Sequence, residues 1–237
     1  MNEAKMITFQ FLFGAAAILV FLRIRLRGEI RAALERDPAA RSAWEILFLY
    51  PSIQAIASHR MAHALHRWGL RFPARLISQT TRGLTGIEIH PGARIGKGLF
   101  IDHGMGVVIG ETAVIGDNVT LFQGVTLGGT GKEKGKRHPT IGNNVVVGAG
   151  AKVLGNFTVG DNVQIGANAV VVREVPANSV VVGVPGRIVR QHGRHFPGIN
   201  LDHTALPDPL AQALEKLQHE IDLIESQLKE HRGKSDS

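Results

Sequence analysis

Aliphatic residues recur at every sixth position from residue 89 onward, and this is the dominant pattern of the chain. They form two series: Ile89, Ile95, Ile101 and, after a two-residue slip, Ile109, Ile115, Leu121, Leu127; then, after an interruption, Ile141, Val147, Val153, Val159, Ile165 and Val171. A period of six fits neither the 3.6-residue repeat of an amphipathic helix nor the alternation of a hairpin strand. It predicts a parallel β-helix, in which each hexad supplies one short strand and one corner and stacked coils stabilise one another.

Small residues fill the rest of each hexad. Glycine often follows the aliphatic position, and the fifth position is small or apolar, at Ala93, Ala113, Val119, Val125, Val145, Ala151, Val163 and Ala169. We expect the aliphatic side chains to point inward and the glycines to lie where the chain turns without room for a Cβ atom. The alternative is a β-sandwich whose glycines fall in register by chance, and thirteen hexads on essentially one frame argue against it.

Helical patterns flank the repeats. Residues 28 to 86 read as helical, with Pro38 after Asp37 predicting a helix start and Pro51 and Pro73 predicting later breaks. Near the other end, a heptad seam follows Asp208 and Pro209, formed by Leu210, Leu214, Leu217, Ile221, Ile224 and Leu228. The seam fits either a lone helix packed on its own subunit or a coiled coil that joins subunits. The fold class is therefore mainly β, a parallel β-helix of hexapeptide repeats with an N-terminal helical domain and a C-terminal helix. We place the boundaries at 1–27, 28–86, 87–190 and 191–237.

Composition narrows the classes of function. The chain has 237 residues and no cysteine, which excludes disulfides and thiolate metal sites. Its net charge of +7 is concentrated at the front, where Arg23, Arg25, Arg27 and Arg31 follow the apolar run from Ile7 to Leu22. This arrangement favours anionic lipid over nucleic acid, since no basic face is interleaved with aromatic residues.

The apolar run is shorter than the roughly 20 residues that usually span a bilayer. Its charges follow the apolar stretch, the reverse of a secretory signal, so we expect a cytoplasmic protein. Three placements stay open for the front segment: a span, an interfacial helix, or a segment buried in the helical domain. The first two placements would give membrane contact through residues 7–27.

Residues that can carry chemistry are few. Glu88 and His90 open the first coil, Asp102 and His103 follow its third hexad, and the interruption from Gly128 to Pro139 holds Arg137 and His138 beside Lys132, Lys134 and Lys136. With eighteen residues per coil, the two later histidines lie roughly two coils apart. They are too distant for one site within a subunit, but they can meet across an interface. The run from Gly128 to Lys132 lacks the spacing of a phosphate-binding Walker loop.

Three stretches together resemble the serine O-acetyltransferases, a family of hexapeptide-repeat acyltransferases. They are Gly86 to Ala93, Ile101 to Thr112, and Gln123 to Lys132 with Arg137-His138-Pro139. The resemblance covers about residues 36 to 190. It implies a left-handed β-helix that transfers acetyl from acetyl-CoA to the hydroxyl of L-serine, giving O-acetyl-L-serine for cysteine biosynthesis. It also implies a homotrimer or a dimer of trimers with active sites between subunits, acetyl-CoA as a co-substrate, no permanently bound cofactor and no metal.

The resemblance also assigns roles. His103 is implied to be the general base, and Glu88 the carboxylate that orients it, at a position where many relatives have Asp. Asp37 and Asp102 are implied to bind the serine ammonium. Arg137 is implied to bind the serine carboxylate, and His138 to assist there or near the developing oxyanion. The implied contacts for acetyl-CoA are Gly129, Gly148, Ala149 and Ala167.

Two family traits concern regulation. Cysteine is implied as a feedback inhibitor in the serine pocket. Many members bind cysteine synthase through a C-terminal isoleucine, whereas this sequence ends with Lys234 to Ser237, so that mode of docking is not expected here.

Three other functions fit the sequence less well. An acetyltransferase acting on sugars is disfavoured by the implied amino-acid contacts of Asp37 and Arg137. A γ-class carbonic anhydrase would need zinc on His90, His103 and His138, but no matching spacing is evident. A purely structural β-helix would leave the joint occurrence of Asp102, His103, Arg137 and His138 unexplained.

Overall fold

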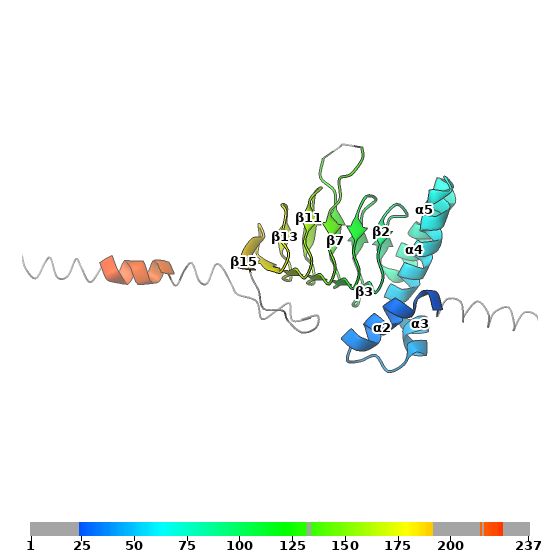
Figure 1. Cartoon of the computed structure of the whole chain (residues 1–237), viewed down its shortest axis with the longest axis horizontal. Coiled ribbons are helices and arrows are strands. Elements are labelled where there is room, and N and C mark those ends of the chain that lie inside the picture. The colour runs from blue at the N-terminus through cyan, green and yellow to red at the C-terminus, as the bar shows by residue number, and fades with distance from the viewer. Residues whose placement is uncertain (1–23, 132–133, 192–213, 215, 225–237) are drawn as a thin grey trace, which may run out of the picture.

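The computed structural model describes residues 24–131, 134–191, 214 and 216–224 (Figure 1). Four helices come first: α2 (Arg27–Arg36), α3 (Ala43–Leu49), α4 (Pro51–Arg67) and α5 (Arg71–Thr85). Short strands follow, each two to five residues long. Residues 214 and 216–224 are helical, within the segment where the heptad seam predicts a helix. Leu214, Leu217, Ile221 and Ile224 are exposed in the single chain, so the choice between a lone helix and a coiled coil stays open.

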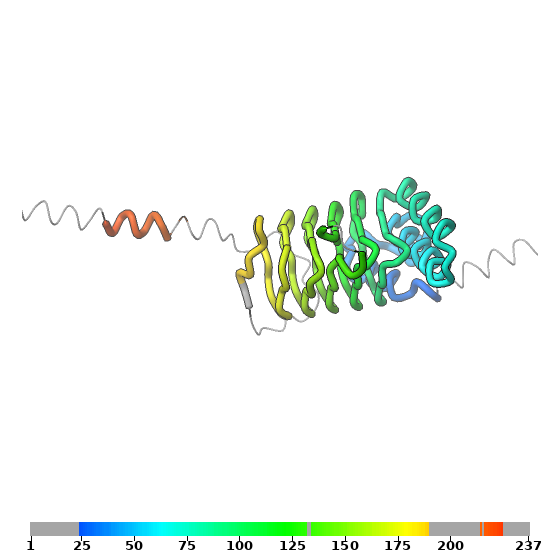
Figure 2. Tube along the Cα trace, turned by 90° about the horizontal axis from the view of Figure 1, so that it is seen from above, coloured from blue at the N-terminus to red at the C-terminus, as the bar shows by residue number. Residues whose placement is uncertain are grey.

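The strands form three sheets that make the sides of a prism (Figure 2). Sheet A contains β1 (Glu88–Ile89), β4 (Val108–Ile109), β7 (Thr126–Gly128), β10 (Lys152–Leu154) and β13 (Val170–Val171). Sheet B contains β2 (Arg94–Ile95), β5 (Val114–Ile115), β8 (Thr140–Ile141) and β11 (Thr158–Val159). Sheet C contains β3 (Phe100–Ile101), β6 (Thr120–Leu121), β9 (Val146–Val147), β12 (Gln164–Ile165), β14 (Ser179–Val182) and β15 (Arg187–Gln191).

Successive strands belong to successive sheets, so each coil contributes one strand to A, B and C. Glu88 of β1 is paired in parallel with Val108 of β4, which is paired in turn with Thr126 of β7. The parallel β-helix predicted from the six-residue period is therefore present. Among the described strands, only β15 is antiparallel to its neighbour, β14, at the end of the prism farthest from α2–α5 (Figure 1).

The core is the column of inward aliphatic side chains. All but one of the predicted positions are at most 4% exposed, namely Ile89, Ile101, Ile109, Ile115, Leu121, Leu127, Ile141, Val147, Val153, Val159, Ile165 and Val171. Ile95 is only partly buried. The small fifth-position residues from Ala93 to Ala169 are at most 1% exposed. The chain therefore buries one aliphatic layer per strand, and it needs few aromatic residues to fill so narrow a prism.

The turns from sheet B to sheet C carry a ladder of side-chain hydrogen bonds. The backbone N–H of Lys97 donates to Asp117 Oδ1 at 2.7 Å, that of Asp117 to Asn143 Oδ1 at 2.8 Å, and that of Asn143 to Asp161 Oδ1 at 2.6 Å. These bonds join residues 20, 26 and 18 positions apart, which shows how the irregular coils stay in register. The wider step of 26 contains the excursion between β7 and β8, which extends away from the prism (Figure 1).

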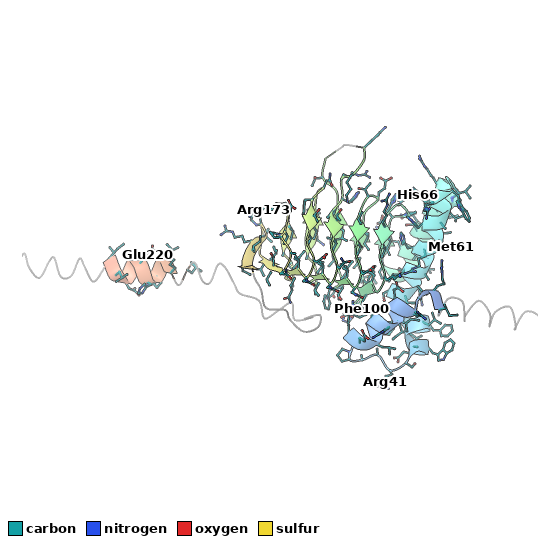
Figure 3. The ribbon with its side chains drawn as sticks, viewed as in Figure 1. Arg41, Met61, His66, Phe100, Arg173 and Glu220 are labelled. Atoms are coloured by element: carbon teal, nitrogen blue, oxygen red, sulfur yellow. The ribbon has the colours of Figure 1, made fainter. Side chains whose placement is uncertain are left out.

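The helices cover one end of the β-helix. Arg36 at the end of α2 donates to the carbonyl of Gly98 at 3.3 Å and to the hydroxyl of Thr120 at 3.1 Å. Phe100 on β3 is buried beside α2 (Figure 3). Within the helices, the buried Glu29 of α2 is paired with Arg60 of α4. These contacts fix the helices relative to the first coils.

Two predictions about the helices are wrong, the helix start at Pro38 and the break at Pro73. Asp37 and Pro38 do not start a helix: Asp37 is the C-terminal cap of α2, and α3 begins after Ser42, whose hydroxyl accepts the N–H of Glu45 at 3.1 Å. Pro51 does begin α4. Pro73 breaks no helix, because it lies in the first turn of α5, where a missing N–H leaves no bond unmade.

No helix in the described ranges is long and apolar enough to cross a membrane. The apolar run from Ile7 to Leu22 lies outside them.

Candidate active site

The residues expected to carry the chemistry lie on two different corners of the prism. The C–A corner is made of the turns from sheet C to sheet A, at residues 102–107, 122–125, 148–151 and 166–169. The A–B corner is made of the turns from sheet A to sheet B, at residues 90–93, 110–113, 129–139 and 155–157. Sheet A separates the two corners within one chain.

His103 lies on the C–A corner, directly after β3. Its backbone φ is 57°, in the left-handed region, and its side chain is 75% exposed. The nearest acidic atom is Asp102 Oδ1, 4.0 Å from His103 Nε2, which is too long for a hydrogen bond. The imidazole therefore faces solvent and not the dry interior, and both ring nitrogens are open to a substrate.

Glu88 does not contact His103 in the single chain. It lies on β1 with its side chain on the outer face of sheet A, and Oε2 is 3.2 Å from Nη1 of Arg82 on α5. Among the described residues, no hydrogen bond or ion pair joins Glu88 to the imidazole. The orienting role implied for this carboxylate thus stays a prediction.

Tyr50 is bonded to Asp37, and the negative charge of Asp102 also acts on it. The Tyr50 hydroxyl donates to Asp37 Oδ2 at 2.5 Å, while Asp37 Oδ1 accepts the N–H of Ala39 at 2.8 Å. Burial raises the pKa of Tyr50, and the hydrogen bond to Asp37 and the negative charges of Asp37, Glu45 and Asp102 raise it further. The tyrosine therefore stays protonated as a donor. The turn after α2 thus places the Asp37 carboxylate on the hydroxyl of a tyrosine whose pKa the charge of Asp102 also raises.

Arg137 and His138 lie on the A–B corner, at the end of the excursion. The Thr112 hydroxyl accepts the backbone N–H of Arg137 at 3.0 Å and that of His138 at 3.2 Å. Arg137 Nη2 donates to Glu111 Oε2 at 2.6 Å. This hydrogen bond lowers the pKa of Glu111. The guanidinium is thus held in place by a carboxylate, with part of its donor fork left for a ligand.

His138 is 7% exposed, far more buried than His103. Its Nδ1 lies 3.2 Å from the N–H of Thr112 and 2.9 Å from the hydroxyl of the same residue. Burial lowers the pKa of His138, and the positive charge of Arg137 lowers it further. The ring packs over Gly110, where an added Cβ would overlap Cδ2 and Nε2 of the imidazole.

His90 lies on the same corner, in the first coil, next to Gly110 of the second coil. Its Nδ1 accepts the N–H of Gly92 at 3.0 Å, and its ring meets His66 of α4 edge-on, with centroids 6.0 Å apart. Burial lowers the pKa of His90 to about 4, with the charge of Arg75 as the next cause. In the part of the chain that the structure describes, no three His, Cys, Asp or Glu side chains are grouped to hold a metal ion. The zinc site of the carbonic anhydrase alternative is therefore not formed by these histidines in one chain.

The small residues expected to contact acetyl-CoA are divided between the corners. Gly148, Ala149 and Ala167 lie together on the C–A corner: a Cβ on Gly148 would come within 2.7 Å of the Ala167 nitrogen, and the Ala149 carbonyl accepts the N–H of Asn168 at 2.8 Å. Gly129 lies on the A–B corner, where a Cβ would come within 3.0 Å of Arg137 Cγ. The C–A corner thus has His103 at one end and a track of small residues at the other.

Three residues at these sites had no role in the sequence analysis: Tyr50, Glu111 and Thr112. Tyr50 is the only tyrosine in the sequence, and this rarity could have marked it as a candidate site residue. Glu111 and Thr112 end the second resembling stretch, but nothing in the spacing indicates that a loop 25 residues later returns to them. Only the fold brings these partners together.

Comparison with known proteins identifies the family. The family model described as "Bacterial transferase hexapeptide (six repeats)" matches residues 138–173. The serine acetyltransferase of Staphylococcus xylosus is 57% identical over 198 residues, which cover 84% of this chain and 91% of the relative.

Solved structures agree with this relationship. The soybean serine acetyltransferase complexed with serine superposes with a TM-score of 0.69 at 47% identity, covering 71% of this chain and 69% of that one. A serine acetyltransferase in complex with cysteine superposes with a TM-score of 0.75 at 38% identity, covering 83% and 77%. The predicted fold, a left-handed parallel β-helix with helices at both ends, is confirmed. With this identity over most of both sequences, the chain belongs to the serine acetyltransferases, a family of hexapeptide-repeat acyltransferases.

Proposed function

We propose that this protein transfers the acetyl group of acetyl-CoA to the hydroxyl of L-serine, giving O-acetyl-L-serine for cysteine biosynthesis. The observation that carries the proposal is the 57% identity to a serine acetyltransferase over 84% of the chain. The exposed imidazole of His103, beside the carboxylate of Asp102 and at the end of a track of small residues, supports it.

In the proposed reaction, His103 takes the proton of the serine hydroxyl as the oxygen attacks the thioester carbonyl. The tetrahedral intermediate collapses, the carbon–sulfur bond breaks, and the imidazolium returns the proton to the leaving thiolate, so that free CoA and O-acetyl-L-serine result. A positioned general base typically contributes about 10²- to 10⁴-fold to such a step. Glu88 is proposed to orient the imidazole once the complete site is assembled.

Asp37 and Asp102 are proposed to bind the serine ammonium. Each Asp37 oxygen accepts one hydrogen bond, Oδ2 from the Tyr50 hydroxyl and Oδ1 from the N–H of Ala39, and each can accept a second one from a further donor. Arg137, held by Glu111, is proposed to bind the serine carboxylate together with His138. The positive and negative groups then match the two ends of a zwitterionic amino acid.

These groups lie on separate corners, so we propose that the active site forms between subunits of a homotrimer or a dimer of trimers. The C–A corner of one subunit would supply Asp102 and His103, and the A–B corner of its neighbour would supply Arg137 and His138. The same assembly would join Gly129 of the neighbour to Gly148, Ala149 and Ala167 along the path of acetyl-CoA. Acetyl-CoA is a co-substrate in this scheme and not a resident cofactor.

The direct test is thiol release from acetyl-CoA, measured with L-serine, with a galactoside and without acceptor. We expect release with serine only, and a loss of roughly two to four decades of kcat in His103→Ala. His219→Ala removes an exposed histidine of the C-terminal helix and should leave the rate unchanged. Faster turnover of the galactoside would support the sugar acetyltransferase instead, and no release with any acceptor would support a structural role.

We also propose that L-cysteine binds in the serine pocket and inhibits, since a related serine acetyltransferase has been solved in complex with cysteine. Inhibition competitive with serine and weakened in Arg137→Ala would agree with this. Cysteine synthase stays a candidate partner, and the tail from Lys234 to Ser237 lies outside the described residues.

We propose a cytoplasmic location with membrane contact through residues 7–27, supported by the apolar run and the arginines that follow it. Fractionation of cells that express the chain with and without residues 1–27 tests this proposal. Equal partition of the two forms into the soluble fraction would contradict the membrane contact.

A further inference from the structure

Thr112 has one hydrogen to donate and a fixed acceptor to receive it. It lies in the turn after β4, and its Oγ1 accepts two backbone N–H groups, from Arg137 at 3.0 Å and from His138 at 3.2 Å. A hydroxyl oxygen has two acceptor positions and one hydrogen. Because both acceptor positions are used, the remaining contact, at 2.9 Å to Nδ1 of His138, must be made by the hydroxyl hydrogen.

A second donor points to the same ring nitrogen. The backbone N–H of Thr112 lies 3.2 Å from His138 Nδ1, and a backbone N–H can only donate. Two hydrogens are therefore directed at Nδ1, which has to present its lone pair to them. In the neutral ring, the proton must then be on Nε2.

The surrounding charges act in the same direction. Burial lowers the pKa of His138, as do the positive charges of Arg137 and Lys136, while the carboxylate of Glu111 opposes them. Lys136 is fixed against this turn, since its Nζ donates to the carbonyls of Thr112 at 2.8 Å and His138 at 2.6 Å. No described acid is bonded to His138 to stabilise an imidazolium.

The Nε2 edge of the ring is free of protein partners. Among the described residues, no hydrogen bond is made to His138 Nε2, although the residue as a whole is only 7% exposed. The floor below this edge is Gly110, where any Cβ would occupy the same space as Nε2. The mostly buried ring thus presents Nε2 without a protein partner, on the chain that also carries the guanidinium of Arg137.

We propose that Thr112 is a positioning residue that locks His138 in the Nε2–H tautomer, so that His138 donates a hydrogen bond to an oxygen anion of the substrate and does not act as a base. The part of the inference that concerns substrate rests on the proposed function, whereas the tautomer does not. His103 and His138 then have different roles in the reaction. His103 has a free lone pair and takes the proton, and His138 has its lone pair occupied and can only give a hydrogen bond.

The tautomer is measured directly by two-bond ¹H–¹⁵N correlation spectra of the full-length protein labelled with ¹⁵N-histidine, with the His138 signals assigned through His138→Asn. We expect unprotonated Nδ1 and protonated Nε2 in the wild type and in Thr112→Ser, which keeps the hydroxyl. In Thr112→Val, which has the same shape without the hydroxyl, we expect mixed tautomers and a higher pKa for His138. The spectra are recorded without substrate.

Kinetics provide the second readout. We expect kcat/KM for serine to fall roughly tenfold to a hundredfold in Thr112→Val and to recover in Thr112→Ser. If kcat/KM falls because KM rises, the bond is donated to the substrate carboxylate. If it falls because kcat falls, the bond is donated to the oxyanion. Thr158→Val changes an exposed threonine on β11 and controls for the substitution itself.

Two results would overturn the inference: protonated Nδ1 in the wild type, or a Thr112→Val protein with the wild-type tautomer, His138 pKa and kinetics. If the variant fails to fold, the wild-type and Thr112→Ser spectra still decide the tautomer. Failure of the proposed function has a different signature, because the Nε2–H tautomer would then be observed in a protein that releases no thiol with serine.

Discussion

At the scale of single residues, the environment of each imidazole decides what it can do. The His103 side chain is 75% exposed and has no hydrogen-bond partner among the described residues, so its lone pair is free to receive a proton. His138 is buried, and both donors of Thr112 occupy its Nδ1. These environments agree with the proposed roles, a base at His103 and a hydrogen-bond donor at His138.

Gly110 is expected to be essential for the position of His138. In Gly110→Ala, the new Cβ would overlap Cδ2 and Nε2 of the imidazole, so the ring must leave the hydroxyl of Thr112. We predict a fall in kcat/KM for serine of roughly tenfold or more, the loss expected when a hydrogen bond to a charged group is broken. Steady-state kinetics measure it.

Gly83→Ala is the matched control, because a Cβ there meets nothing within 4 Å and the residue lies inside α5. Alanine should stabilise that helix by up to about 1 kcal/mol and leave the kinetics unchanged. Wild-type kinetics in Gly110→Ala would show that the ring tolerates displacement.

At the scale of elements, polar ladders along the corners hold the coils in register. Asn162 has a left-handed φ of 57°, accepts a hydrogen bond from the amide of Asn144 at 3.1 Å and donates one to Asn178 at 3.0 Å. Asparagine tolerates this backbone conformation better than residues with other side chains. The corner therefore depends on the residue type and not only on the hydrophobic core.

Asn162→Ala should lower the free energy of unfolding by about 1–3 kcal/mol, through left-handed strain and two lost hydrogen bonds. Asn162→Gly loses the same hydrogen bonds, but glycine adopts a left-handed φ without strain. The glycine variant should therefore be less destabilised than the alanine variant. Urea denaturation at one protein concentration compares the three proteins. A glycine variant that is less stable than the alanine variant would contradict the assigned strain.

The packing of α4 on the first coils makes stability depend on pH. His59 of α4 is 6% exposed, and burial lowers its pKa to about 3, with the charges of His63 and Arg60 adding to the effect. The unfolded chain binds this proton below about pH 6.5, while the folded chain does not. The free energy of unfolding should therefore fall as the pH drops from 6.5 toward 3, by up to about 1.4 kcal/mol per pH unit for this group.

The check is urea denaturation of wild type and His59→Gln at several values between pH 7 and pH 4.5. His90, whose pKa is lowered to about 4, contributes in the same direction, so the variant should keep a reduced slope and not a zero slope. His219→Gln alters an exposed histidine and serves as the control. An unchanged slope in His59→Gln would mean that His59 is protonated in the folded state.

At the scale of the whole molecule, sheet A keeps the two halves of the proposed site apart. Asp102 and His103 belong to the C–A corner, whereas Arg137 and His138 belong to the A–B corner. An adjacent copy that sets its A–B corner against this C–A corner would complete the site. The isolated chain should therefore be inactive, however well it folds.

Subunit mixing tests this arrangement. His103→Ala and His138→Ala are each expected to have low activity, but if each site takes one histidine from each of two adjacent subunits, equal random mixing leaves about a quarter of the interfaces with both intact. Co-expression should then restore activity toward that fraction. A double variant, His103→Ala with His138→Ala, mixed with either single variant should restore none. No recovery in the first mixture would place both histidines of a site in one chain.

The sequence by itself determined the β-helix, because a period of six with inward aliphatic residues leaves only stacked coils as a way to bury them, and Ile109, Leu121 and Ile165 are fully buried as predicted. It also determined the residues on which the proposed reaction depends, through their resemblance to a family. It did not determine that Asp37 ends a helix. An aspartate before a proline can either cap the start of the next helix or end the previous one, and the local sequence does not distinguish the two. The eighteen-residue coil already indicated that His103 and His138 cannot share a site within one subunit. Only the tertiary structure decided that Thr112 meets His138 and that Glu111 holds Arg137. The physical reason is that the number of residues in each coil and excursion decides which distant residues are stacked on one another. No local pattern of the sequence specifies this number for the excursion.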